Sequence, residues 1–211
     1  MNFLHKIPIF FFSLVYPCKI YGRENIPKKG EPAVLVCNHF RAIDCGFIAR
    51  AYGKDLKILA KKELFKNKFF SKIISSYGAI PVDRDKPDLK SMLASSKVLK
   101  EGHKLAIFPE GTRNTVNDEL QELKGGSAFF AVKAKCPIVP MMLSGKAKPF
   151  RRTHLIIGKP FELTEYYDTK ITPELTVKMD GVVRDKMLEQ QTILKELLEK
   201  KKKDKNATDK R

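Results

Sequence analysis

The chain has 211 residues, of which 41 are Lys or Arg and 24 are Asp or Glu, so its formal net charge is +17 at neutral pH. Hydrophobic residues make up 43% of the chain, a share that excludes intrinsic disorder for most of it. The sequence has no glycine period and no sustained heptad, which excludes collagen and coiled-coil architectures, and its length suits a single domain.

The positive charge is spread over the whole chain. Residues 195–211 carry eight basic and four acidic side chains, a net of +4, so that +13 remains in the body. A basic body implies an anionic partner. Composition leaves three such partners open, namely nucleic acid, an anionic membrane surface and an acidic substrate carrier.

The first apolar stretch, residues 7–16 (IPIFFFSLVY), is uncharged. Ten helical residues span about 15 Å, half of a hydrocarbon core of roughly 30 Å, so this stretch is too short to cross a bilayer alone. It fits either a first core helix or an interfacial element that inserts Phe and Leu side chains into one leaflet. Pro8 and Pro17 mark its predicted ends.

Downstream, short apolar runs alternate with amphipathic stretches, which is typical of an α/β fold. The predicted strands are residues 33–37, 56–60, 79–82, 104–108, 138–143 and 154–157. The predicted helices are residues 87–101, 125–135 and 173 to about 202. In the first of these helices, Leu89, Met92, Leu93 and Leu99 form one apolar stripe, which predicts its buried face. Three parts result: an apolar N-terminal element (1–19), a main domain (20–194) and a Lys-rich tail (195–211), predicted to be disordered beyond the last helix.

One polar motif, residues 38–44 (NHFRAID), directly follows the strongest predicted strand. Five helical positions rotate two side chains by about 500°, so His39 and Asp44 can pair only if His39 precedes the helix and Asp44 lies in its first turns. Such a junction is where α/β folds place ligand chemistry. A paired Asp44 would fix the tautomer of His39 and leave the other ring nitrogen to take a proton from a hydroxyl. The alternative is a helix-start histidine beside a surface carboxylate.

Two further loops follow predicted strands. Residues 108–113 (FPEGTR) form a Pro–Gly turn, in which Arg113 has the geometry to hold a phosphate through two parallel hydrogen bonds. Lys124 precedes a glycine pair at a predicted helix start, a position that faces anions. Residues 78–84 (GAIPVDR) place Arg84 just past another strand. Each loop alone also fits a turn that carries a solvated charge.

The sequence lacks the motifs that mark several other classes of enzyme. Residues 125–127 (GGS) do not match the GxSxG turn of serine hydrolases, and the sequence holds neither a phosphate-binding P-loop nor GxGxxG. The four cysteines form no CxxC pair and no zinc-binding spacing.

Taken in order, NHxxxxD, GxIPVDR, FPEGTR, LKGG and IVP resemble the motifs of the glycerolipid acyltransferase family, and the similarity covers about residues 21–158. The resemblance implies an α/β domain with a central mixed sheet flanked by helices, a short apolar N-terminal helix and a long C-terminal helix. It also implies a catalytic pair, in which His39 is the general base and Asp44 orients it. The acceptor-binding pocket that it implies is formed by Lys61, Arg84, Glu110, Gly111, Thr112 and Arg113.

The activity implied by this resemblance is transfer of a fatty acyl chain from an acyl thioester to the sn-2 hydroxyl of lysophosphatidic acid. The donor is acyl carrier protein or coenzyme A, and glycerol 3-phosphate or another lysophospholipid is the alternative acceptor. No metal or organic cofactor is expected, because the thioester is already activated. The basic body and tail are expected to hold the enzyme on the anionic cytoplasmic face of the cell membrane, as a peripheral or monotopic protein.

A basic nucleic-acid-binding protein is the rival class. Against it, the sequence carries no recognised nucleic-acid motif and no Trp, and its Phe residues concentrate in the apolar N-terminus. We therefore expect no nucleic-acid partner.

Overall fold

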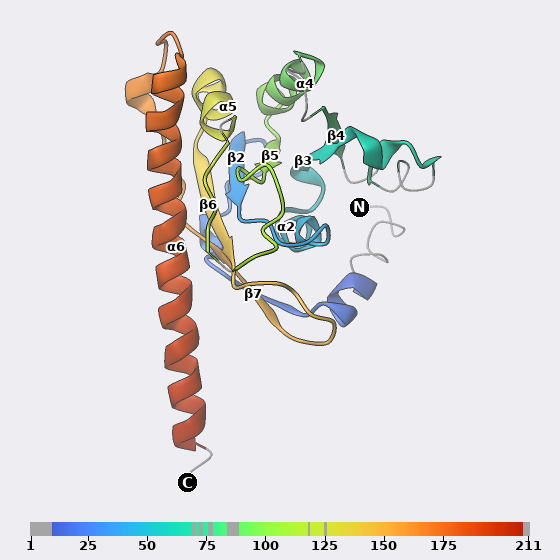
Figure 1. The fold of residues 1–211 in the computed structure, drawn as a ribbon, viewed down its shortest axis with the longest axis vertical. Helices are drawn as coiled ribbons and strands as arrows, with labels where there is room; N and C mark the ends of the chain where they lie inside the picture. Colours follow the sequence, from blue (N-terminus) through green and yellow to red (C-terminus); the bar gives the residue numbers. More distant parts are fainter. Residues whose placement is uncertain are drawn as a thin grey trace.

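The structure is a computed structural model, and it describes residues 10–68, 71, 74–75, 78–83, 89–117, 119–124 and 126–208. Figure 1 shows a central sheet with helices on both sides and one long helix that extends beyond it. The strands are β1 (Cys18–Tyr21), β2 (Ala33–Cys37), β3 (Leu56–Lys61), β4 (Ala79–Val82), β5 (Lys104–Ile107), β6 (Ile138–Leu143) and β7 (Thr153–Ile157).

The strands form one sheet in the order β1-β7-β6-β2-β5-β3-β4. Neighbouring strands run parallel except for β6 and β7, which are antiparallel. The sheet is therefore mixed, which confirms the expected fold class. Every residue of β2, β5 and β6 is buried, because helices cover both faces of these central strands.

The α-helices are α2 (Asp44–Tyr52), α4 (Leu89–Lys100), α5 (Ser127–Ala134) and α6 (Pro173–Thr208). Short 3₁₀ turns lie at η1 (Arg23–Asn25), η2 (Gly53–Asp55), η3 (Lys62–Phe65) and η4 (Thr164–Tyr166). One sheet face packs against α4, α5 and α6, and the other packs against α2 and the N-terminal residues. The two hydrophobic cores follow from the strands, whose alternate side chains point to opposite faces of the sheet.

The N-terminal segment packs on the core with only part of its surface. Residues 10–15 are helical, and Phe12 packs on Phe47 of α2 with ring centroids 5.1 Å apart. Its neighbours Phe10 and Phe11 are 60% and 61% exposed. One side of this short helix thus belongs to the core and another faces outward. Pro8, its predicted start, lies outside the described residues.

The predicted strands agree with the observed ones to within one residue at either end, but β1 was not predicted. It pairs in parallel with β7 through residues 18–21, so the expected domain boundary after residue 19 falls inside a strand. No local signal marks this strand, because four residues at the edge of a sheet gain their order from a partner more than a hundred positions away.

The predicted buried stripe of α4 is confirmed at Leu99 and wrong for its other three residues. Leu89 and Leu93 are 67% and 63% exposed, and the face that packs on the sheet carries Ser91 and Ser95 beside Val98 and Leu99. The small serines let the helix approach closely, and the Ser91 hydroxyl donates to the carbonyl of Pro81 at 2.7 Å.

The last helix continues further than predicted. Residues 203–208, expected to be disordered, extend α6 to Thr208, because Lys and Ala favour helix and no Gly or Pro interrupts them. Near this end, the Lys201 ammonium donates to the Tyr21 hydroxyl at 3.0 Å and lies 4.6 Å from the centre of its ring. The helix end is thereby attached to β1, and the expected boundary after residue 194 falls within α6.

Candidate active site

The predicted pair of His39 and Asp44 is formed in the structure. His39 lies on the turn after β2 and Asp44 is the first residue of α2, so the two side chains meet with Nδ1 and Oδ2 3.1 Å apart. The same Oδ2 accepts the backbone N–H groups of Phe40 and Arg41 at 2.6 and 2.7 Å. The sequence forms a tight turn here because one carboxylate caps it and also orients the imidazole.

This arrangement leaves Nε2 as the ring nitrogen of His39 that can exchange a proton with a substrate. Asp44 is fully buried, and the His39 side chain is 8% exposed. The ring stacks on Phe108, with centroids 3.9 Å apart and planes 18° apart. Carboxylate and aromatic ring together fix the imidazole in one orientation, as a general base requires.

The FPEGTR loop joins the histidine turn through Glu110. Its Oε1 accepts the backbone N–H of His39 at 2.7 Å, and its Oε2 accepts that of Gln121 at 3.2 Å. The carbonyl of His39 in turn accepts the backbone N–H of Asn114 at 2.7 Å. Burial raises the pKa of the Glu110 carboxyl, and the two N–H donors oppose that rise. Glu110 thus shapes the site by fixing backbone, a role that the motif alone did not reveal.

On its other side the histidine turn is attached to β6. The Asn38 side chain donates to the carbonyl of Leu143 at 3.1 Å and accepts its N–H at 2.7 Å. His39 therefore lies between two anchors, one on the loop after β5 and one at the end of β6. Both strands are direct neighbours of β2 in the sheet.

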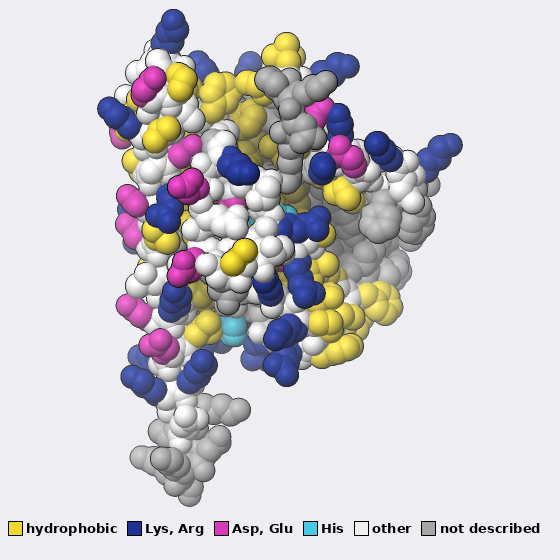
Figure 2. Space-filling view, viewed as in Figure 1, with side chains coloured by type: hydrophobic (Ala, Val, Ile, Leu, Met, Phe, Trp, Pro, Cys, Tyr) yellow, Lys and Arg dark blue, Asp and Glu magenta, His cyan; other side chains and the backbone are white. Residues whose placement is uncertain are grey.

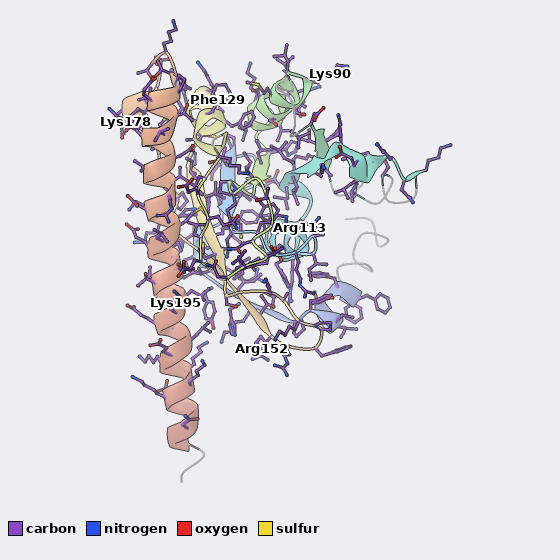
Figure 3. All side chains as sticks on the ribbon, in the orientation of Figure 1. Lys90, Arg113, Phe129, Arg152, Lys178 and Lys195 are labelled. Atoms are coloured by element: carbon purple, nitrogen blue, oxygen red, sulfur yellow. The ribbon has the colours of Figure 1, made fainter. Side chains whose placement is uncertain are left out.

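The predicted phosphate-binding residues that the structure describes lie at the same edge of the sheet. Thr112 and Arg113 are exposed on the FPEGTR loop. Figure 3 labels the side chain of Arg113. The backbone of Gly111 has a φ of 69°, and a β-carbon there would meet Lys124 Cδ at 3.0 Å, so the lysine stem packs against this turn. Lys61 ends β3, and its ammonium lies 3.7 Å from the Glu63 carboxylate. Arg84 lies outside the described residues.

Asp83, the residue before Arg84, forms an ion pair with Lys62. This pair ties the end of β4 to the turn that follows β3. The carboxyl ends of β2, β5, β3 and β4 therefore lie at one edge, because these strands are parallel. The arrangement can activate a hydroxyl at His39 beside a group of cations that suits an anionic substrate.

None of the helices in the described part of the chain is both long and apolar enough to span a bilayer. The apolar N-terminal helix is short, and α6 is long but strongly charged.

The chain is similar in sequence to known acyltransferases. The family model described as Acyltransferase matches residues 17–144, which include every residue of the candidate site. The 1-acyl-sn-glycerol-3-phosphate acyltransferase of Bacillus subtilis is 34% identical over 156 residues, covering 70% of this chain and 75% of that protein. The protein of the same name from Streptococcus pneumoniae is 34% identical over 152 residues, which are 69% of this chain and 56% of that protein.

A solved structure has the same fold. The crystal structure of the 1-acyl-sn-glycerophosphate (LPA) acyltransferase PlsC from Thermotoga maritima aligns with a TM-score of 0.65 at 24% sequence identity. The alignment covers 85% of this chain and 74% of that one.

Proposed function

Because the chain belongs to the Acyltransferase family, we propose that it transfers a fatty acyl group from an acyl thioester to the sn-2 hydroxyl of lysophosphatidic acid. The observation that carries this proposal is the buried, hydrogen-bonded pair of His39 and Asp44, with Nδ1 and Oδ2 3.1 Å apart at the carboxyl edge of the sheet. The relatives that bear the name 1-acyl-sn-glycerol-3-phosphate acyltransferase support this acceptor.

The proposed reaction begins when His39 Nε2 takes the proton of the acceptor hydroxyl. The hydroxyl oxygen attacks the thioester carbonyl carbon, and the C–S bond breaks as the new ester forms. The imidazolium, stabilised by Asp44, then returns its proton to the departing thiolate. Such a base supplies about 10²- to 10⁴-fold of the rate, and positioning of the two substrates supplies much of the rest. The thioester is already activated, so the proposed reaction requires no metal or organic cofactor.

The acceptor phosphate is proposed to lie against the cations on the β5 and β3 side of His39. Arg113 offers paired N–H donors on the exposed loop, and Lys124 packs beside the same turn. Lys61 lies at the end of β3, and Arg84 follows β4 in the sequence. The phosphate of this acceptor is close to the reacting hydroxyl. The cations that bind it are therefore expected to lie close to His39.

We propose further that the protein acts while bound to an anionic membrane surface. The exposed side of the N-terminal helix carries Phe10, Phe11 and Leu14, the last 55% exposed. In the loop between β6 and β7, Phe150 is 78% exposed, and its backbone N–H donates to the carbonyl of Val15 at 2.6 Å. Figure 2 shows hydrophobic side chains over the N-terminal helix beside a group of Lys and Arg side chains. Apolar insertion surrounded by basic charge is the pattern of an interfacial protein.

The test offers acyl carrier protein and coenzyme A thioesters with lysophosphatidic acid, with glycerol 3-phosphate and with a lysophospholipid that has a larger headgroup. We expect phosphatidic acid from the first acceptor and little product from the others. His39→Ala should keep the circular dichroism spectrum and lower kcat by at least about 10²-fold. Retention of more than a few per cent of the activity in that variant contradicts the mechanism. Preference for another acceptor contradicts the assigned substrate.

A further inference from the structure

A second basic feature lies beside the active site and has no role in the chemistry described so far. The ends of β6 and β7 and the loop after β5 enclose a pocket of about 470 Å³, here called the β6–β7 pocket. Four of its lining residues are basic, and none of its described lining residues is acidic: Lys146, Lys148, Arg151 and Arg152. The labelled side chain of Arg152 lies at the β7 end of this region in Figure 3, and Figure 2 shows Lys and Arg side chains gathered there.

The pocket is joined to His39 from two directions. Leu143, directly before the lining residue Ser144, exchanges two hydrogen bonds with Asn38, directly before His39. From the other side, the Lys146 ammonium donates to the carbonyl of Thr115 at 2.7 Å, next to Asn114, which bonds His39. Since consecutive residues are about 3.8 Å apart, the wall of the pocket begins within a few residues of the catalytic base.

Most of the residues that line the pocket lie on the β6 side of β2, whereas the proposed acceptor cations lie on the β5 and β3 side. The sheet order β6-β2-β5-β3 puts His39 between β6, which leads into the pocket, and β3, which ends at Lys61. A reaction that joins two substrates at His39 brings them in from different sides. Cations on the second side are therefore available to the donor, whose thioester carbonyl must reach the same nitrogen.

Both candidate donors carry their acyl group on a 4′-phosphopantetheine arm, with a phosphate at the end opposite the thioester. In lysophosphatidic acid, by contrast, the phosphate is on the carbon next to the one that bears the hydroxyl. None of residues 38–44 lines the pocket, so a phosphate bound there is not held at the histidine turn itself and fits the donor better than the acceptor. Arg151 and Arg152 can bind phosphate oxygens in pairs, and the hydroxyls and amide of Ser144, Thr153 and Asn117 add neutral donors.

We propose that the β6–β7 pocket binds the phosphate of the 4′-phosphopantetheine arm of the acyl donor. This inference rests on the proposed function for its substrate class. An anionic lipid headgroup shares the phosphate chemistry, but a hollow whose walls are hydrogen-bonded to the two ends of the histidine turn suits the reacting substrate better than a flat membrane contact does.

The test removes two of the charges without touching the catalytic machinery. The variant Lys148→Gln with Arg151→Gln changes two exposed side chains of the pocket. The matched control is Lys178→Gln with Lys195→Gln, which removes the same charge from exposed positions on α6, labelled in Figure 3. Rates are measured in uncharged detergent micelles, so that an anionic surface plays no part.

Four acyl donors of one chain length are compared: acyl-pantetheine, which lacks the phosphate, acyl-4′-phosphopantetheine, acyl-coenzyme A and acyl carrier protein thioester. We expect the pocket variant to raise KM about tenfold for the three phosphate-bearing donors, with kcat and the acceptor KM unchanged. Acyl-pantetheine should react equally with wild type and variant. A larger effect on acyl-coenzyme A than on acyl-4′-phosphopantetheine assigns part of the pocket to the phosphates of the nucleotide, and an effect confined to the carrier protein thioester overturns the proposal.

Three other results also overturn the proposal: a raised KM for the acceptor instead of the donor, equal effects on donors with and without phosphate, and loss of binding to anionic vesicles without any change in donor KM. Titration calorimetry with unacylated 4′-phosphopantetheine gives a readout that needs no acyl transfer, and we expect weaker binding by the pocket variant than by the control. If the ligand binds in this way but no acceptor is acylated, the proposed function fails while the pocket assignment stands.

Discussion

The backbone N–H of His39 donates to Oε1 of Glu110 at 2.7 Å, so the histidine turn and the FPEGTR loop share one buried carboxylate. Replacing Glu110 with Ala leaves the N–H groups of His39 and Gln121 unpaired. We expect this variant to lose about 2–4 kcal/mol of unfolding free energy, measured by urea denaturation. Glu122→Ala, at an exposed neighbouring position, serves as the control. Equal stability of the two variants would show that the carboxylate does not hold the loops together.

Asp44→Asn separates the structural from the catalytic role of this residue. The amide oxygen can still accept the N–H groups of Phe40 and Arg41, so the turn should persist. The negative charge that stabilises the His39 imidazolium is lost, and we expect kcat to fall by about 10²- to 10⁴-fold. Asp44→Ala should lower both kcat and the melting temperature. Near-normal turnover by the Asn variant would remove Asp44 from the mechanism.

Gly46→Ala should displace the N-terminal helix. A β-carbon at residue 46 would lie 2.6 Å from Cζ of Phe12, so the aromatic ring must move away from α2. We expect a loss of about 1–3 kcal/mol in stability and faster proteolysis before residue 17. The same substitution at Gly181 of α6, where nothing lies within 4 Å of the new carbon, should stabilise the protein by about 0.5–1 kcal/mol. Similar effects at both positions would contradict the packing of Phe12.

Phe150→Ser tests the proposed membrane contact. The φ of Phe150 is 58°, a left-handed conformation that a bulky side chain rarely adopts, and its ring is held outward. Loss of this ring should weaken binding to anionic vesicles by about ten- to a hundredfold in a sedimentation assay. Val177→Ser, at a position that is 72% exposed on α6, should leave vesicle binding unchanged. An undiminished affinity of the Phe150 variant would exclude the loop from the membrane contact.

Asp180 should make the stability of the protein depend on pH. Burial raises the pKa of its carboxyl to about 6, and its buried Oδ1 accepts no hydrogen bond from the described residues. The native state therefore holds this proton more tightly than the unfolded chain does, so ionisation above pH 6 destabilises the fold. Asp180→Asn should add about 1–2 kcal/mol at pH 8, and this gain should vanish by about pH 4. Asp185→Asn, exposed on the same helix, is expected to show no such trend in thermal melts.

Local patterns predicted the central strands because β2, β5 and β6 are continuous apolar runs that end at turn residues. The pairing of His39 with Asp44 could be predicted because it depends on a single strand–helix junction. β1 and the buried face of α4 could not be predicted from local patterns, because they depend on which surfaces meet in three dimensions. In α4, Leu89 and Leu93 lie on one side, and Ser91 and Ser95 lie on another. The helix packs its small serine side against the sheet, so hydrophobicity alone predicts the wrong buried face.

At the site, the motifs did not predict the hydrogen bonds of Glu110 or the gathering of cations in the β6–β7 pocket. The sequence indicated that Glu110 and His39 belong to one site, but not that the carboxylate accepts backbone N–H groups of the histidine turn and of Gln121. The cations of the β6–β7 pocket are dispersed over residues 146–152 in no recognisable motif, and they come together only through the fold.

The antiparallel pairing of β6 with β7 has a further consequence for how such an enzyme can diversify. The connections from β2 to β3 and from β5 to β6 return across the sheet through α2 and α5 before the next strand begins. The loop between β6 and β7, by contrast, leaves and re-enters the sheet at the catalytic edge. Ala147 of this loop belongs to one of the cores, but residues 148–152 are exposed. Those five positions can therefore lengthen, shorten or change charge without disturbing either core, since insertions in a surface loop carry little energetic penalty. Selection acting on this loop alone can alter what approaches His39 from that side while the acid–base chemistry stays intact.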